Sequence, residues 1–127
     1  MNINEKYHIG LLCLVHLLIN ADGVIDEKER AALLKIKTLE QIPDAIFQEF
    51  ERNIANQKER AIYQLGIELI NECSTEEKLK AFVHLYKMSE ADGSVHVKEV
   101  RLLLYSIRQA GIEFDDVVNR ASQLKSF

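Results

Sequence analysis

The 127-residue sequence has little of several residue types that mark special classes of protein. It contains two cysteines, one proline, five glycines and no tryptophan. Two cysteines without a paired spacing exclude a disulfide framework and favour reduced thiols. The scarcity of proline and glycine excludes collagen-like and low-complexity chains. What remains is an ordinary globular protein, since 47% of the residues are hydrophobic and 28% are charged.

Positive charge is scarce as well, because 16 lysines and arginines stand against 20 aspartates and glutamates, which gives a formal net charge of −4. No run of basic residues occurs in the chain. Proteins that bind nucleic acid need clustered cations for the phosphate backbone. The composition therefore disfavours nucleic acid as a partner and leaves protein partners.

The longest hydrophobic run covers residues 9–19 and is eleven residues long. A helix needs about 20 residues to cross roughly 30 Å of hydrocarbon. His16 interrupts the run, and no cleavage pattern of a signal peptide follows it. We therefore expect no transmembrane segment, a cytoplasmic protein, and a central helix that is buried because it is apolar all round.

Hydrophobic residues recur at spacings of three and four along the whole chain, which predicts an all-α fold with a single domain over residues 1–127. Leu104 and Phe114 are expected on the buried stripes of the last two helices. We expect seven helices, at about residues 4–20, 26–38, 43–54, 57–72, 75–90, 97–110 and 113–125.

Signals for helix ends agree with these ranges. Ser74 and Glu77 have the spacing of a capping box, in which each side chain bonds the other residue's backbone amide. Pro43 is expected in the first turn of a helix, where its missing amide hydrogen costs nothing. Gly111 is expected to end a helix with a positive φ angle.

A five-residue motif occurs twice, as ADGVI at residues 21–25 and ADGSV at residues 91–95, an offset of 91 − 21 = 70. The similarity continues downstream, and each motif follows one long predicted helix and precedes another. We therefore predict an internal repeat of residues 7–38 and 77–108. It would form two helical hairpins related by a pseudo-twofold axis, each with an ADG corner.

The repeated pattern D-G-x-[IV]-x-x-x-E is the second half of an EF-hand calcium loop, with oxygen ligands for a hard cation and a glycine for the turn. The first half of the loop is missing in both copies, so either copy alone supplies about half of the ligands. Two half-loops brought together could share one ion. The candidate metal ligands are Asp22, Asp26, Glu29, Asp92, Glu99 and His96.

The same residues also fit a corner that is purely architectural. Gly23 and Gly93 would end the preceding helices in the left-handed conformation. Asp26 and Glu29 would form a capping box at the start of the next helix. The residues themselves leave both interpretations open.

His96 is a candidate ligand because it lies beside the carboxylates of the motif. His16 and His84 lie on mostly apolar helices, where a hydrogen-bonded histidine at the core or its boundary is common. His8, near the start of the chain, is expected to be solvated. The sequence has no H-E-x-x-H, G-x-S-x-G or phosphate-binding glycine motif, so we expect no enzyme and no organic cofactor.

The segments ADGVIDEKE at residues 21–29 and ADGSVHVKE at residues 91–99, with the long helix before each, resemble the TerB family of bacterial tellurite resistance. This family also looks similar to the N-terminal region of a DnaJ-like membrane co-chaperone. The resemblance implies an all-α fold of about seven helices, an acidic surface cluster proposed to bind metal, and no established catalytic activity. On this chain the cluster would comprise Asp22, Glu29, Asp92 and Glu99, with Asp26 nearby.

We therefore expect a non-enzymatic module of a bacterial stress system, with an acidic patch that binds a divalent cation (Ca²⁺, Mg²⁺, Mn²⁺ or Zn²⁺) or a partner. Its partners would be proteins, some of them at the inner membrane surface. The first alternative is a purely structural interaction domain without metal. A third hypothesis is a metal-dependent hydrolase that uses the same carboxylates with a metal-bound water.

Overall fold

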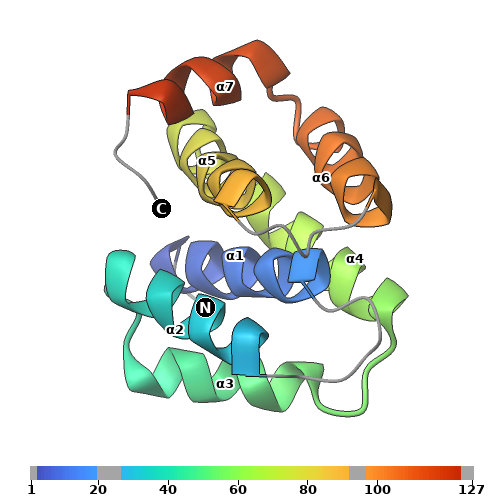
Figure 1. Cartoon of the computed structure of the whole chain (residues 1–127). Helices are drawn as coiled ribbons and strands as arrows, with labels where there is room; N and C mark the ends of the chain where they lie inside the picture. Colours follow the sequence, from blue (N-terminus) through green and yellow to red (C-terminus); the bar gives the residue numbers. More distant parts are fainter. Residues whose placement is uncertain (1–2, 20–26, 92–96, 124–127) are drawn as a thin grey trace.

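The computed structural model of the chain describes residues 3–19, 27–91 and 97–123 (Figure 1). In these ranges the regular structure is entirely α-helical, so the predicted all-α fold is confirmed, with every helix within three residues of its expected ends. The helices are α1 (Ile3–Ile19), α2 (Glu27–Leu39), α3 (Asp44–Ile54), α4 (Glu59–Asn71), α5 (Thr75–Ala91), α6 (Val97–Gln109) and α7 (Phe114–Ser122).

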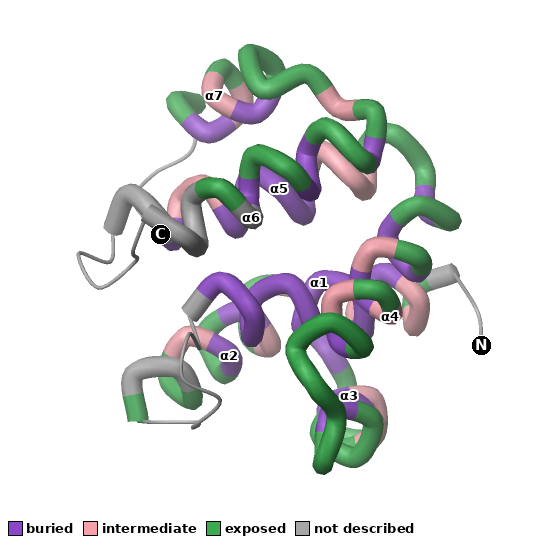
Figure 2. The backbone as a smooth tube through the Cα atoms, turned by 90° about the vertical axis from the view of Figure 1, so that its right-hand side faces the viewer, coloured by how far each residue is buried: buried purple, intermediate pink, exposed green. Residues whose placement is uncertain are grey.

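The helices form three layers, with α1 and α4 in the middle, α5–α7 on one side, and α2 and α3 on the other (Figures 1 and 2). Helix α1 contacts α2, α3, α4, α5 and α6. Every residue from Ile9 to Leu18 is buried, which confirms the expected central helix (Figure 2). None of the described helices combines the length and hydropathy that crossing a bilayer requires.

Two glycines allow α1 and α4 to pack closely. A Cβ atom built on Gly66 of α4 would lie 2.9 Å from the Cβ atom of Cys13 in α1. A Cβ atom on Gly10 of α1 would lie 2.9 Å from Cγ1 of Ile70 and 3.1 Å from the carbonyl oxygen of Gly66. The two helices therefore meet at a distance that side chains at these positions would prevent.

The residues predicted to begin or end helices do so in the structure, with one difference. The Glu77 amide donates to Ser74 Oγ at 3.2 Å, and the Ser74 amide donates to Glu77 Oε1 at 3.1 Å, which confirms the capping box. Gly111 has a φ of 73°, also as predicted. Pro43 is the N-cap of α3 and not a residue of its first turn, because its extended ψ of 148° lies outside the helical range.

The offset of 70 residues that relates the two ADG motifs also relates features of the backbone. Helices α2 and α6 have 13 residues each and begin 97 − 27 = 70 residues apart. Helices α3 and α7 begin 114 − 44 = 70 residues apart. Gln41 and Gly111, also 70 residues apart, both have positive φ angles, of 53° and 73°. Corresponding turns thus connect α2 to α3 and α6 to α7.

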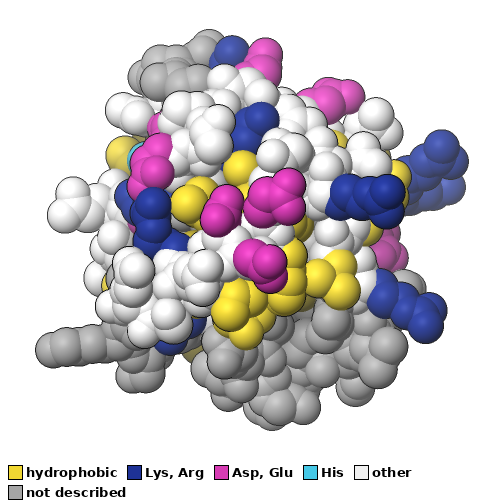
Figure 3. All heavy atoms as spheres, turned by 90° about the horizontal axis from the view of Figure 1, so that it is seen from above, with side chains coloured by type: hydrophobic (Ala, Val, Ile, Leu, Met, Phe, Trp, Pro, Cys, Tyr) yellow, Lys and Arg dark blue, Asp and Glu magenta, His cyan; other side chains and the backbone are white. Residues whose placement is uncertain are grey.

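The expectation that Leu104 and Phe114 are buried is wrong. Their relative exposures are 44% and 40%, whereas Leu103 and Ile107 on the same helix as Leu104 are almost fully buried. The outer position of α6 and α7 explains the difference, because an outer helix buries only a narrow stripe. The outer face of α5–α7 accordingly shows hydrophobic side chains next to acidic ones (Figure 3).

Candidate functional site

The two ADG motifs lie at corresponding junctions between helices. The first motif lies between the end of α1 at Ile19 and the start of α2 at Glu27. The second motif begins with Ala91, the last residue of α5, and precedes the start of α6 at Val97. Helix α1 contacts α2 and helix α5 contacts α6, so each motif connects two helices that pack on each other.

Two of the six predicted metal ligands fall on described helices. Glu29 is the third residue of α2, and Glu99 is the third residue of α6. The side chains of both glutamates lie outside what the structure describes. So do the other four predicted ligands, namely Asp22, Asp26, Asp92 and His96.

Among the residues that the structure does describe, no group of three or more His, Cys, Asp and Glu side chains is arranged to hold a metal ion. This finding concerns the carboxylates, histidines and cysteines of the helical body.

A buried ionic cluster lies where the end of α2 meets α1 and α5. The side chain of Glu40 is only 4% exposed. Its Oε1 atom accepts a hydrogen bond from His84 Nε2 at 3.0 Å and lies 3.2 Å from Lys80 Nζ. The buried Tyr7 hydroxyl is adjacent to the same carboxylate, without full hydrogen-bond geometry to any described group. The cluster thus ties three helices together.

The surroundings of Glu40 keep it ionised. Burial alone would raise its pKa, but the neighbouring donors His84, Tyr7 and Lys80 outweigh burial and lower the pKa to about 2. Burial, and after it the charge of Glu40, raises the pKa of Tyr7 far above its usual value. A carboxylate with so low a pKa is a weak base, so this arrangement suits a structural anchor better than proton transfer.

Sequence reasoning missed the Glu40 cluster. Its members come from positions 7, 40, 80 and 84, which share no motif and no helical spacing except between Lys80 and His84. A lysine and a histidine four residues apart on one helix are too common to predict a buried partner. Only the packing of α2 and α5 against α1 brings the carboxylate to them.

The three described histidines differ from one another. His16 is 8% exposed and His84 is half-buried with its Glu40 partner, as expected for histidines at or near a core. The expectation that His8 is solvated holds only in part, because the residue is half-buried and its Nδ1 atom is buried without a hydrogen-bond partner in the described structure. Burial lowers the pKa of His8, against the opposing charge of Glu40.

The family of the chain follows from a comparison over most of its length. Residues 8–120 match the family described as tellurite resistance protein TerB. The chain belongs to the TerB family. The matched region contains both ADG motifs and extends from α1 into α7, so the resemblance inferred from those motifs is confirmed. No curated protein and no solved structure matches the chain.

The two cysteines of this TerB domain are buried, free thiols. Burial raises the pKa of Cys13 to about 12. Burial and the charge of Glu77 raise the pKa of Cys73 to about 11, and its Sγ atom donates to the carbonyl oxygen of Leu69 at 3.4 Å. Since the thiolate is the nucleophile, neither buried thiol is activated for nucleophilic catalysis at neutral pH.

Proposed function

We propose that this TerB domain is a non-catalytic binding module of a bacterial stress response, and that its two ADG corners together bind a divalent cation. The observation that carries the proposal is the equivalent position of Glu29 and Glu99, each the third residue of the helix after its motif. The first turn of a helix favours an ionised carboxylate because the backbone amides there are partly positive. A glutamate in that place also supplies the last ligand of an EF-hand loop.

The backbone offset of 70 residues supports a repeat that is longer than two hairpins. We take each unit to comprise three helices, α1–α3 and α5–α7, with α4 between them. Turn hydrogen bonds support this, because the amide of Ile42 donates to the carbonyl of Lys37 at 2.9 Å and that of Ile112 donates to Ile107 at 3.1 Å. Units that pack on each other around a pseudo-twofold axis would bring equivalent corners to one side of the molecule.

The proposed site needs both corners. A hard cation prefers six or more oxygen ligands, and each half-loop has about half of that number. A site made of Asp22, Glu29, Asp92 and Glu99, with Asp26 nearby, would complete the shell. The module would act in the cytoplasm with protein partners, including partners at the inner membrane surface, and the bound ion would set the charge of the surface that they meet.

A second candidate function is a structural interaction domain whose corners bind no ion. The observed capping box of Ser74 and Glu77 favours it, because this chain demonstrably uses a glutamate three residues after a small polar residue to cap a helix. Asp26 and Glu29 have the same spacing. Under this alternative both carboxylates would be occupied by backbone amides.

Calorimetric titration of the metal-free protein with Ca²⁺, Mg²⁺, Mn²⁺ and Zn²⁺ tests the proposal. We expect at least one ion to bind, and we expect the double variant Asp22→Asn, Asp92→Asn to lose binding while it keeps its melting temperature. Asparagine preserves the turn chemistry and removes the charge. The matched control is Asp115→Asn, Asp116→Asn, which removes two exposed charges from the first turn of α7.

The outcomes separate the two candidates. Loss of binding in the corner variant but not in the control supports a cation site at the corners. A wild-type protein that binds none of the four ions at millimolar concentration contradicts the cation proposal and leaves the structural interaction domain. Binding that both double variants weaken equally would show a diffuse attraction to negative charge and no site.

A further inference from the structure

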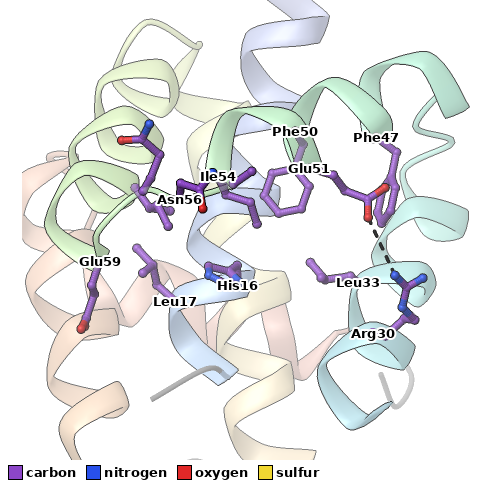
Figure 4. Close-up of a pocket in the computed structure, with 13 residues that line it drawn as sticks. His16, Leu17, Arg30, Leu33, Phe47, Phe50, Glu51, Ile54, Asn56 and Glu59 are labelled. Carbon is purple, nitrogen blue, oxygen red and sulfur yellow. Dashed lines mark ion pairs between the residues drawn. The ribbon is translucent and has the colours of Figure 1, made fainter. Parts of the chain in front are cut away.

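A cleft of about 510 Å³ opens on the side of the molecule where α1, α2, α3 and the start of α4 meet (Figure 4). Pockets that bind small molecules have volumes of about 300 to 1,000 Å³. None of the described residues that line the cleft is one of the six candidate metal ligands, so the inference below is argued separately from the cation proposal. Its lining combines an apolar floor with polar groups around the mouth, which is the usual composition of a ligand site.

The floor of the cleft consists of hydrophobic side chains from all four helices. Each of these side chains is at most 9% exposed, so the walls are fixed by packing in the core. His16, which is 8% exposed, adds one polar ring between Leu17 and Leu33 (Figure 4). The hydrophobic residues are Leu17, Leu33, Phe47, Phe50, Ile54 and Ile62.

Two carboxylates lie at opposite ends of the cleft, Glu51 on α3 and Glu59 at the start of α4 (Figure 4). Glu59 makes no ion pair with any residue that the structure describes. Glu51 lies 3.9 Å from the guanidinium of Arg30, and the two side chains are 46% and 63% exposed. A pair so long and so exposed contributes little, so Glu51 can exchange Arg30 for another cation at small cost.

The charges decide between classes of ligand. Among the lining residues that the structure describes, one arginine and two glutamates give a formal charge of −1 with His16 neutral. A carboxylate ligand would gain Arg30 but would meet two like charges. A hydrocarbon without charged groups would bind the floor but gain nothing from either exposed carboxylate. An alkyl chain with an ammonium group at each end satisfies the floor and both carboxylates.

We propose that this cleft binds an aliphatic amine, with the hydrocarbon stem over the apolar floor and ammonium groups paired with Glu51 and Glu59. A diamine offers an ammonium group to each carboxylate, whereas a monoamine offers only one. The amide side chains of Asn56 and Gln57, on the connection between α3 and α4, line the same mouth and can accept hydrogen bonds from the ammonium.

Four probes of similar length test the proposal by calorimetry or by NMR titration of the full chain: cadaverine, pentylamine, pentanol and pentanoate. Each exposed ion pair is expected to contribute a factor of about two to five in affinity. The expected order is therefore cadaverine, pentylamine, pentanol, with pentanoate weakest. Pentanoate that binds as tightly as pentylamine, or pentanol that binds as tightly as cadaverine, would overturn the proposal.

Charge variants sharpen the test, because the proposal fixes the sign of each effect. Glu51→Gln and Glu59→Gln should each weaken cadaverine binding by about two- to fivefold. Arg30→Gln should tighten it, because the arginine competes for Glu51. Glu113→Gln removes an exposed glutamate at the start of α7, away from the cleft, and should change nothing. Tighter pentanoate binding to wild type than to Arg30→Gln, with cadaverine unaffected by all variants, would assign the cleft to anions instead.

An aliphatic amine can be a free metabolite or a lysine side chain of a partner, and a fifth probe separates these sources. N-acetyl-lysine methylamide carries the same butylammonium group on a peptide unit. Affinity equal to that of pentylamine would indicate a lysine side chain as the occupant. Exclusion of this probe from a cleft that accepts cadaverine would indicate a free diamine.

Discussion

Replacement of Gly66 by alanine is expected to destabilise the protein, although alanine is ordinarily the better residue inside a helix. In an open helical site the change from glycine to alanine would gain about 1 kcal/mol. At Gly66 the new Cβ atom would lie 2.9 Å from the Cβ atom of Cys13. Two carbon atoms prefer a separation of roughly 3.5 to 4.0 Å, so α1 and α4 would have to move apart.

The magnitude follows from these opposing terms. Overpacking a rigid core site costs about 1 to 3 kcal/mol, and here the clashing atom is attached directly to the backbone of α1 within its buried stretch. Subtracting the gain in helix propensity leaves a net loss of up to about 2 kcal/mol. With an unfolding entropy of about 2.1 cal/mol/K per residue, this loss corresponds to a melting temperature lower by up to about 8 °C.

Thermal melts followed by circular dichroism at 222 nm, the usual helix signal, would measure the shift. Ala61→Gly, at an exposed position of the same helix, calibrates the intrinsic difference between the two residues and should lose about 1 kcal/mol. In a double-mutant cycle, Cys13→Gly should relieve part of the cost of Gly66→Ala because it removes the clashing atom. A Gly66→Ala protein that melts above the wild type would refute the close helix crossing.

Three further predictions concern single features of the fold. Gly111→Ala should lose about 1 kcal/mol because φ is 73°, whereas Gln41→Gly, at a φ of 53°, should gain up to about that amount; thermal melts check both. Ser74→Ala should cost about 1 kcal/mol in urea unfolding because the Glu77 amide loses its acceptor, and an unchanged midpoint would argue against the cap. The pKa of Glu40 is lowered to about 2 from 4.5, so its contribution is present above pH 4.5 and lost as the pH falls toward 2. Glu40→Gln should lower the free energy of unfolding at neutral pH by up to about 3 kcal/mol, and the variant should lack the wild-type loss of stability between pH 4.5 and 2. If the free energy of unfolding depends on pH in the same way in variant and wild type, this prediction is contradicted.

The helices of this fold could be predicted because their causes are local. Apolar spacing, the Ser74 and Glu77 box and the glycine at position 111 act within a few residues, and each gave the right structure. The burial of Leu104 and Phe114 could not be judged in the same way. Periodicity indicates which side of a helix faces the core, but the width of the buried stripe depends on how many neighbours the helix has.

The features that position charge could not be predicted, because they depend on contacts between distant parts of the chain. Glu40 lies 44 residues from His84, and nothing near either residue indicates the other. The cleft needs α1 to α4 in their final places before Glu51 and Glu59 form its two ends. The ADG corners differ from these features, because the motif and its repetition can be read directly from the sequence. Their role as metal ligands stays a prediction.

Helix α1 takes part in each of these features, which constrains how they can be tested. Tyr7 belongs to the Glu40 cluster, Cys13 to the crossing with α4, and His16 and Leu17 to the cleft, while the end of the helix leads into the first ADG motif. A substitution in α1 therefore disturbs neighbouring features through shared packing, and its effects are not additive with theirs. Substitutions on the partner side, in α2, α3 and α4, change one feature at a time. Changes such as Glu40→Gln, Glu59→Gln and Gly66→Ala are the ones that can separate ionic anchoring, ligand binding and helix packing in this protein.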